Sequence, residues 1–489
     1  MNAATVFETI RENIIGYNGN EEMHSGEEVQ GITSMYQNLG KNNIFMLKAS
    51  KNSAKYLQEA ILRKPVLIIT DFEKDAFIDF HDEVAICYVD DFARVSIQLV
   101  ELFYSEHISR MKYIAVTGTN GKTTTSHFIG RLLSELGYKV ATIGTLGVFD
   151  GAYEKVDFAH TTPTTPMHFE FAEIIKYFSI RDYDYIVYEA TSIALDQGRT
   201  GFIRNDLAVF INFSPEHLDY HRTMTRYLES KLSLADLSDE VLVNMDASEY
   251  RVLAKDRHHF SEHEDTYYRY RTDIDHIDLH VGGVHYEVRP RFLGEHNYIN
   301  LATGIFALLK LGHDVDAVIG AAAKVTPPVH RFELFSEGQH QFILDFAHTP
   351  VAIKESIINA MKYAEKMEKK LIVMVTGIGL RGYGKIRMTM ELVPEGLHHL
   401  VLAAEQVGYE DEEKIVGMMQ KHLPASYDDS NTTTALSRQE GIIRAIGNAG
   451  ADTIILLTGI NEPQHYRGDV IAHDDRQFIL QYLSESRKA

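Results

Sequence analysis

The sequence has almost no cysteine and no long apolar run. Cys87 is the one cysteine among 489 residues, which excludes a disulfide scaffold or a thiolate metal cluster and suits a reducing cytosol. No apolar run approaches the roughly 20 residues that a membrane-spanning helix needs. The N-terminus, MNAATVFETIRENI, carries charges and lacks the apolar core of a signal peptide. We therefore expect a soluble, cytoplasmic protein.

Basic charge is also in short supply. The chain has 48 Lys and Arg against 69 Asp and Glu, a formal net charge of −21. Such a surface repels nucleic-acid phosphates and anionic lipids, so neither nucleic acid nor a membrane is expected as a partner. Hydrophobic residues make up 45% and charged residues 24%, the balance of a globular protein. The sequence contains no internal repeat or low-complexity stretch, and it indicates no obligate protein partner.

The length predicts about three domains, because a domain averages roughly 150 residues. Short apolar runs alternate with helical patterns, which is typical of parallel sheets covered by helices. Pro327 and Pro328 break the pattern and mark a linker. We predict an α/β protein with domains at 1–110, 111–328 and 329–489. The expected strands include 42–49, 65–72, 84–90, 184–190, 206–213, 340–347, 371–377, 399–404 and 452–459, and the expected helices include 54–64 and 92–108.

The most specific motif is a glycine-containing loop at 117–124, TGTNGKTT, between an expected strand and an expected helix. Glycines let the backbone wrap around phosphate oxygens, and the helix N-terminus directs N–H groups at them. Lys122 would contact the β- and γ-phosphates, and the hydroxyl of Thr123 or Thr124 could bind Mg²⁺. Val116 replaces the first glycine of the usual phosphate-loop pattern. The loop nevertheless predicts a nucleoside triphosphate site.

A magnesium–nucleotide site also needs carboxylates. Glu189 ends the apolar run 185–188, so it would project from the carboxyl end of a strand, where ligands of open α/β sheets collect. His217 and His221 follow another expected strand. Either histidine alone would more often be structural than a ligand, whereas Glu189 is a good candidate for Mg²⁺.

Seven blocks of sequence resemble those of the Mur ligases, most closely the MurE-type ligases that add the third residue of the peptidoglycan stem peptide. The resemblance covers the central domain and much of the last one. It implies a three-domain architecture, with a central ATP-binding phosphate-loop domain and a C-terminal Rossmann-like domain. The blocks are 117–125, 161–163, 189–199, 212–231, 293–308, 331–333 and 345–350.

The resemblance implies an ATP-dependent, ADP-forming ligase. In this family an acceptor carboxylate attacks the γ-phosphate to form an acyl phosphate, which an amine then converts to an amide. The positions that match catalytic residues are Lys122, Lys231, His217 and Arg331. The ATP-binding positions are Gly118, Thr119, Asn120, Gly121, Lys122, Thr123, Thr124, His296, Asn297, Arg331 and Asp345. Two Mg²⁺ ions are implied, at Thr123, Thr124, Glu189, His217 and Lys231, with Lys231 carbamylated.

The resemblance also implies where the two other substrates bind, although the sequence departs from the family there. The first domain lacks the family's uridine-binding arginine. Residues 402–408, LAAEQVG, stand where the family usually has the DNPR loop that selects the amino acid. The acceptor positions are Thr161, Thr162, Thr191, Gln197 and Arg199, and those for the amine are Arg381, Lys385 and Glu462. We predict a MurE-like ligase with a non-standard acceptor. A true UDP-N-acetylmuramoyl-dipeptide ligase and an inactive nucleotide-binding subunit are the alternatives.

Overall fold

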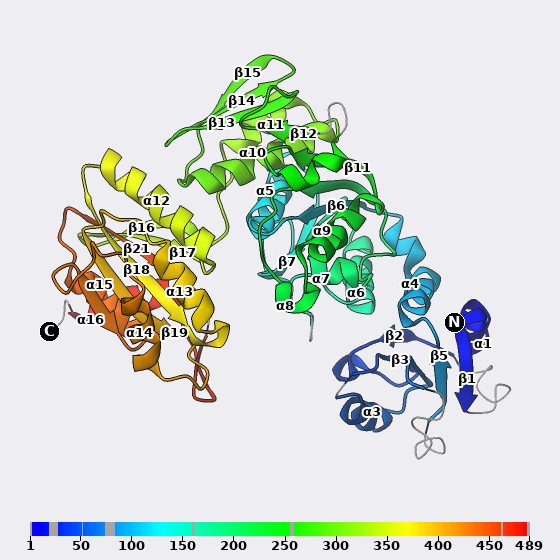
Figure 1. Ribbon diagram of the computed structural model, residues 1–489. Coiled ribbons are helices and arrows are strands. Elements are labelled where there is room, and N and C mark those ends of the chain that lie inside the picture. Colours follow the sequence, from blue (N-terminus) through cyan, green and yellow to red (C-terminus); the bar gives the residue numbers. More distant parts are fainter. Residues whose placement is uncertain are drawn as a thin grey trace. The chain divides into compact units, whose positions relative to one another are not determined.

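The computed structural model describes residues 2–18, 28–50, 52–73, 84–158, 162–254, 259–460 and 463–486. The residues form two compact units, one of Met1–Arg269 and Thr303–Ala321, the other of Tyr270–Ala302 and Ala322–Ala489 (Figure 1). Among the described helices, none is both long enough and apolar enough to cross a bilayer. The α/β class predicted from the sequence is confirmed, since helices alternate with parallel strands throughout.

The first unit begins with a five-stranded sheet in the order β1-β5-β4-β3-β2. Its strands pair in parallel except β1, which runs antiparallel to β5 at the edge. Helix α4 begins where predicted, because Asp91 caps the N–H of Arg94 at 3.0 Å. The elements are α1 (Ala3–Ile10), β1 (Ile14–Asn18), β2 (Gly31–Thr33), β3 (Asn43–Leu47), α3 (Ser53–Ile61), β4 (Leu67–Thr70), β5 (Ile86–Val89) and α4 (Phe92–Ile108).

A second sheet of this unit has the order β13-β12-β11-β10-β6-β9-β7-β8. The strands from β13 to β7 are parallel, so their carboxyl ends meet at one edge, and β8 closes the other side antiparallel. The elements are β6 (Lys112–Thr117), α5 (Lys122–Glu135), β7 (Val140–Gly144), β8 (Gly147–Phe149), α6 (His168–Ser179), β9 (Tyr185–Glu189), α7 (Ser192–Asp196), β10 (Asn205–Phe210), α8 (Leu218–His221), α9 (Met224–Leu232), β11 (Ser238–Asn244), β12 (His259–Ser261), β13 (Tyr268–Thr272) and α11 (Val315–Ala322).

The second unit contains a sheet in the order β16-β17-β21-β18-β19-β20, parallel apart from the edge strand β16. Strand β18 is almost wholly buried because helices cover both of its faces (Figure 1). Leu371, Val373 and Val375 pack with α12, α13 and α14. Ile372 and Met374 pack with α15 and α16.

The elements of this second sheet system follow one another as a βα alternation that ends in a small hairpin and a last helix. They are β16 (Arg331–Glu337), β17 (His340–Asp345), α12 (Pro350–Lys366), β18 (Lys370–Ile378), α13 (Tyr383–Glu391), β19 (His399–Glu405), α14 (Glu412–Lys421), β20 (Thr432–Ala435), α15 (Arg438–Gly447), β21 (Thr453–Thr458), β22 (Gln464–Tyr466), β23 (Asp469–Ile471) and α16 (Asp475–Ser486).

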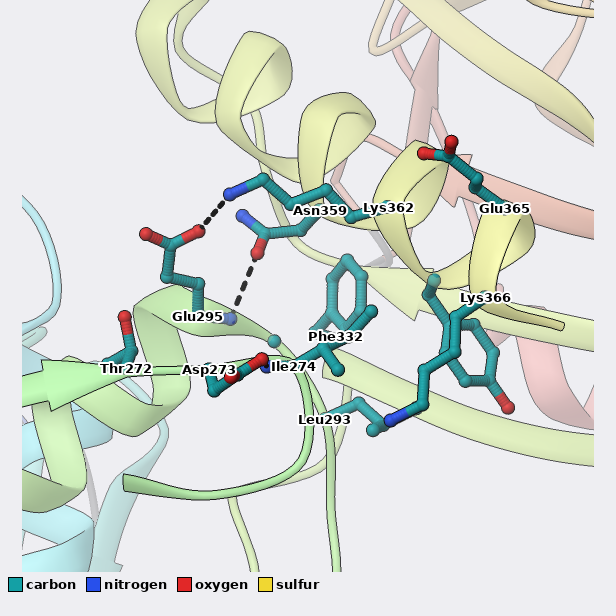
Figure 2. Close-up of a pocket in the computed structure, with 12 residues that line it drawn as sticks. Thr272, Asp273, Ile274, Leu293, Glu295, Phe332, Asn359, Lys362, Glu365 and Lys366 are labelled. Atoms are coloured by element: carbon teal, nitrogen blue, oxygen red, sulfur yellow. Dashed lines mark hydrogen bonds and ion pairs between the residues drawn. The ribbon is translucent and has the colours of Figure 1, made fainter. Parts of the chain in front are cut away.

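The segment 270–302 packs on α12 within the second unit. It carries the hairpin β14 (Ile277–Val281) and β15 (Val284–Val288) and the start of α10 (Glu295–Lys310). Figure 2 shows how the start of α10 is attached: Asn359 accepts the Glu295 N–H at 2.9 Å, and Lys362 pairs with the Glu295 carboxylate at 2.6 Å. A cavity of about 500 Å³ lies beside these contacts, and none of the predicted site residues lines it.

Candidate active site

The predicted phosphate loop connects β6 to α5. Gly121 has φ +80°, a left-handed conformation that glycine adopts without strain. The Lys122 ammonium donates to the carbonyl oxygens of Gly118 and Thr119, each at 3.0 Å. The loop therefore has the strand–turn–helix setting that phosphate binding requires.

Asn212, which the sequence analysis did not single out, fixes the shape of this loop. Its side-chain oxygen accepts the N–H groups of Thr119 and Asn120 at 3.0 and 2.9 Å, and its amide donates to the Asn120 carbonyl at 3.1 Å. Phe210 pairs in parallel with Thr117, so a residue two positions further lies opposite Thr119. Only the folded sheet defines that register, so the sequence carried no local signal for Asn212.

Lys231 is 1% exposed and lies under the same loop. Its ammonium donates to the Gly118 carbonyl at 2.7 Å, the oxygen that Lys122 also contacts. Burial, and then the charge of Lys122, holds the pKa of Lys231 well below its usual range. The two lysine side chains that the sequence predicted for catalysis are thus brought together.

Glu189 is 1% exposed at the carboxyl end of β9, as predicted. Its carboxylate accepts the N–H of Thr145 at 2.7 Å and the Thr145 hydroxyl at 3.2 Å. Gly144 permits this position, because a Cβ there would lie 2.0 Å from a Glu189 oxygen. Glu189 and Thr123 line one small cavity of about 20 Å³, room for one water or ion. A hydroxyl and a carboxylate are oxygen donors that suit Mg²⁺.

The two histidines after β10 have different surroundings. His217 is exposed, has φ +55°, and its ring centroid lies 6.1 Å from that of Tyr227. Desolvation lowers the pKa of His217, the Glu216 carboxylate opposes this, and Lys122 and Lys231 lower it further. His221 is buried, and its Nε2 lies 3.0 Å from the Ser192 hydroxyl. Of the two, His217 has the exposure that a ligand needs.

Three of the predicted acceptor positions are linked by hydrogen bonds. Arg199 donates to the Gln197 side chain and to the Thr165 carbonyl, both at 2.9 Å. The Thr191 hydroxyl lies 3.1 Å from that of Thr165. Thr162 is held separately, since its N–H donates to Glu170 at 2.7 Å. The remaining predicted position, Thr161, lies outside the described residues.

Thr162 and Glu170 also line a cavity of about 340 Å³, together with residues of the N-terminal sheet system. Tyr36 and Tyr56 stack there, with ring centroids 5.9 Å apart. Lys48 is the one lysine or arginine among the described residues that line this cavity. Its walls are therefore mostly apolar and aromatic.

The predicted nucleotide contacts of the second unit lie close together. Asn297 donates to the Arg331 carbonyl at 2.8 Å, and Arg331 lies opposite Asp345 in the antiparallel register of β16 and β17. The Arg331 guanidinium lies 4.9 Å from the Phe346 ring centroid. Desolvation lowers the pKa of His296, an effect that the Asp345 carboxylate opposes.

The predicted amine positions are only partly described. Lys385 is exposed in the first turn of α13, Arg381 ends a short 3₁₀ turn at Gly379–Arg381, and Glu462 lies outside the described residues. At the end of β19, where the selecting loop was expected, Glu405 instead forms a buried ion pair with Arg438. Arg438 also donates to Asp475 at 2.8 Å. The sequence analysis missed this network.

Comparison with protein families identifies two matching domains. Residues 116–308 match the Mur ligase middle domain, and residues 330–461 match the Mur ligase, glutamate ligase domain. A UDP-N-acetylmuramoyl-L-alanyl-D-glutamate–2,6-diaminopimelate ligase of Geobacillus thermodenitrificans is 29% identical over 458 residues, which cover 88% of this chain and 90% of the relative.

Solved structures show the same fold. One is a UDP-N-acetylmuramoyl-L-alanyl-D-glutamate–2,6-diaminopimelate ligase, with a TM-score of 0.62 and 21% identity over 96% of this chain and 99% of the other. Another is a bifunctional folylpolyglutamate synthase/dihydrofolate synthase of Yersinia pestis, complexed with AMPPNP and a manganese ion. It has a TM-score of 0.56 and 17% identity over 75% of this chain and 90% of the other.

Proposed function

The chain belongs to the Mur ligase family, and on that premise we propose which of its residues carry the reaction and which substrates it takes. It is an ATP-dependent ligase that adds an amino acid to a small-molecule acceptor. The observation that carries the proposal is the convergence of Lys122 and Lys231 on one carbonyl oxygen, that of Gly118. The Lys122 ammonium at the N-terminus of α5 favours an anionic ligand there, as a nucleoside triphosphate would supply.

The reaction we propose has two steps. The acceptor carboxylate attacks the γ-phosphorus, which forms an acyl phosphate and releases ADP. The amine then attacks the acyl carbon, and phosphate leaves from the tetrahedral intermediate. Lys122 stabilises the negative charge that develops on the transferred phosphoryl group. Mg²⁺ held by Glu189 with Thr123 or Thr124 would neutralise phosphate charge in both steps.

Lys231 is proposed to react with CO₂ and become a carbamate. A neutral amine is the reactive form, and the lowered pKa of Lys231 favours that form. The carbamate would place an anion beside the Lys122 ammonium, where a protonated Lys231 would be repelled. Together with His217 it would then offer donors for a second Mg²⁺.

His296, Asn297, Arg331 and Asp345 are proposed to bind the nucleotide from the second unit. An arginine can pair with two phosphate oxygens at once, and the burial of Asp345 beside Arg331 positions both groups. Lys385, Arg381 and Glu462 remain the proposed contacts of the incoming amine. Arg438 forms an ion pair with Glu405. Its positive charge is therefore already neutralised and does not serve to bind a second carboxylate of an amino acid.

The acceptor is proposed to lack a nucleoside diphosphate. The cavity that Thr162 lines presents Lys48 as its one described lysine or arginine, beside the Tyr36 and Tyr56 rings. A diphosphate needs several charge-assisted hydrogen bonds, each worth about 1.5–3 kcal/mol. An acceptor with a carboxylate and an apolar or ring-shaped body suits these walls better. A UDP-N-acetylmuramoyl-dipeptide, which the name of the Geobacillus relative implies for that protein, is the alternative.

The test is a screen of carboxylate acceptors crossed with the amino acids, read by ADP release and by product mass. UDP-N-acetylmuramoyl-dipeptide is included as one acceptor, and Lys122→Ala is the inactive control. Turnover with another acceptor and none with the uridine nucleotide supports the proposal. Efficient turnover with the nucleotide would overturn it, and ATP binding without turnover on any pair would favour a regulatory subunit.

A further inference from the structure

The hairpin β14–β15 presents one polar face that the ligase reaction does not use. Its strands are joined by Gly282 and Gly283, both at positive φ, and the register pairs Asp278 with Glu287 and His280 with His285. Side chains alternate between the faces of a strand. The buried residues Ile277, Leu279 and Val288 therefore occupy one face, whereas His276, Asp278, His280, His285 and Glu287 share the other.

The polar groups of this face lie at distances that suit ligands of one metal ion. His276 Nε2 is 3.7 Å from Asp278 Oδ2, and His285 Nε2 is 2.8 Å from Asp278 Oδ1. Ligand atoms of His276, Asp278 and Glu287 all lie within 4.8 Å of one another. In a tetrahedral site with bonds of about 2.0–2.1 Å, ligand atoms are about 3.3 Å apart. His285 lies outside that group and reaches it through its contact with Asp278, so its side chain must turn toward the other ligands when an ion binds.

A second carboxylate orients the first histidine. His276 Nδ1 lies 2.9 Å from Asp275 Oδ1, and Lys366 pairs with the other Asp275 oxygen at 3.2 Å. A carboxylate only accepts hydrogen bonds, so Asp275 holds a proton on Nδ1 and leaves Nε2, on the side of Asp278, as the nitrogen that a metal ion would occupy in place of a proton. Histidines that bind metals in proteins are oriented in this way.

We propose that this face of the hairpin binds one Zn²⁺ ion through His276, Asp278, His285 and Glu287. Two imidazoles and two carboxylates favour zinc over magnesium, which prefers oxygen ligands alone. Arg289 pairs with Glu287 at 2.7 Å, and a carboxylate can keep one oxygen on an arginine while the other binds a metal. The bound ion would join β14 to β15 and, through Asp275 and Lys366, join the hairpin to α12. The site is independent of ligase activity.

The experiment titrates zinc chloride into the full-length protein without a histidine tag, with saturating Mg²⁺ and a competing chromogenic chelator. We expect one site with a dissociation constant of roughly 1 µM or below. Replacing both His276 and His285 by alanine should weaken it at least about tenfold, and Asp275→Asn about 10- to 100-fold. His398→Ala, an exposed histidine of the same unit, is the matched control.

Two further measurements distinguish the loss of a zinc ligand from the unfolding of a variant. Glu287→Gln keeps the shape of the side chain and should also weaken zinc binding, while thermal unfolding without metal stays at the wild-type temperature. Co²⁺ in place of zinc should give the intense visible absorption of a tetrahedral site in wild type and lose it in the histidine variant. Zinc binding that is equal in wild type and in the double histidine variant, or weaker than about 100 µM in wild type, would overturn the proposal.

Discussion

Replacement of Asn212 by alanine tests whether the phosphate loop depends on a side chain outside it. The substitution removes three hydrogen bonds to Thr119 and Asn120. At a net value of about 1 kcal/mol each, the loss is about 3 kcal/mol, or roughly 10²-fold in affinity. The loop must then be ordered by the nucleotide itself, so we expect AMPPNP with Mg²⁺ to bind about 100-fold more weakly.

Isothermal titration with AMPPNP and excess Mg²⁺ measures this loss directly. Asn212→Asp keeps the acceptor oxygen but loses the donor and adds a negative charge near the phosphates, so it should bind at least as weakly as the alanine variant. Asn244→Ala is the matched control, because Asn244 ends the neighbouring strand β11 and its side chain accepts the N–H of Asp246 instead. Binding by Asn212→Ala within about threefold of wild type would refute the reasoning.

Three further predictions follow from the site and its surroundings. Lys122→Ala should lower ADP release by about 10²-fold or more with an unchanged unfolding temperature, and retention of a tenth of the rate would contradict the role of Lys122. Gly144→Ala should displace the Glu189 carboxylate and raise the Mg²⁺ concentration for half-maximal turnover about tenfold; an unchanged Mg²⁺ titration would count against that. His168 is buried, which lowers its pKa to about 4. Between pH 6.5 and 4 the unfolded chain therefore takes up a proton that the folded chain does not, so the free energy of unfolding falls by about 3 kcal/mol as pH falls. In the His168→Gln variant, the free energy of unfolding measured in urea should change less with pH than in the wild type. A pH dependence equal to that of the wild type would contradict this prediction.

The strand and helix pattern was largely predictable from the sequence. The expected helix 92–108 coincides with α4, and each of the nine expected strands overlaps an observed one. Buried strands such as β18 are uninterrupted apolar runs, which can be recognised in the sequence alone. The division into domains at 110/111 and 328/329 stays a prediction.

The interactions between distant residues were not predictable in the same way. Arg438 lies 33 residues from Glu405 and 37 from Asp475, and no local period records such a pairing. Asn212 supports the loop from 92 residues away, through a strand register that only the folded sheet defines. Gly144 was likewise overlooked, because its importance lies in the atom that it lacks.

Cys87, the sole cysteine, lies at 0% exposure in β5, between β1 and β4 of the N-terminal sheet. A thiol in that position reacts with a reagent only when the surrounding strands separate, so its labelling rate reports the local opening of that sheet. Because Cys87 is buried, the folded protein is not expected to react with thiol reagents at its surface. Two cysteines introduced at exposed positions, one in each unit, would then be the sites labelled, so distances between the two units could be measured without removal of a native residue.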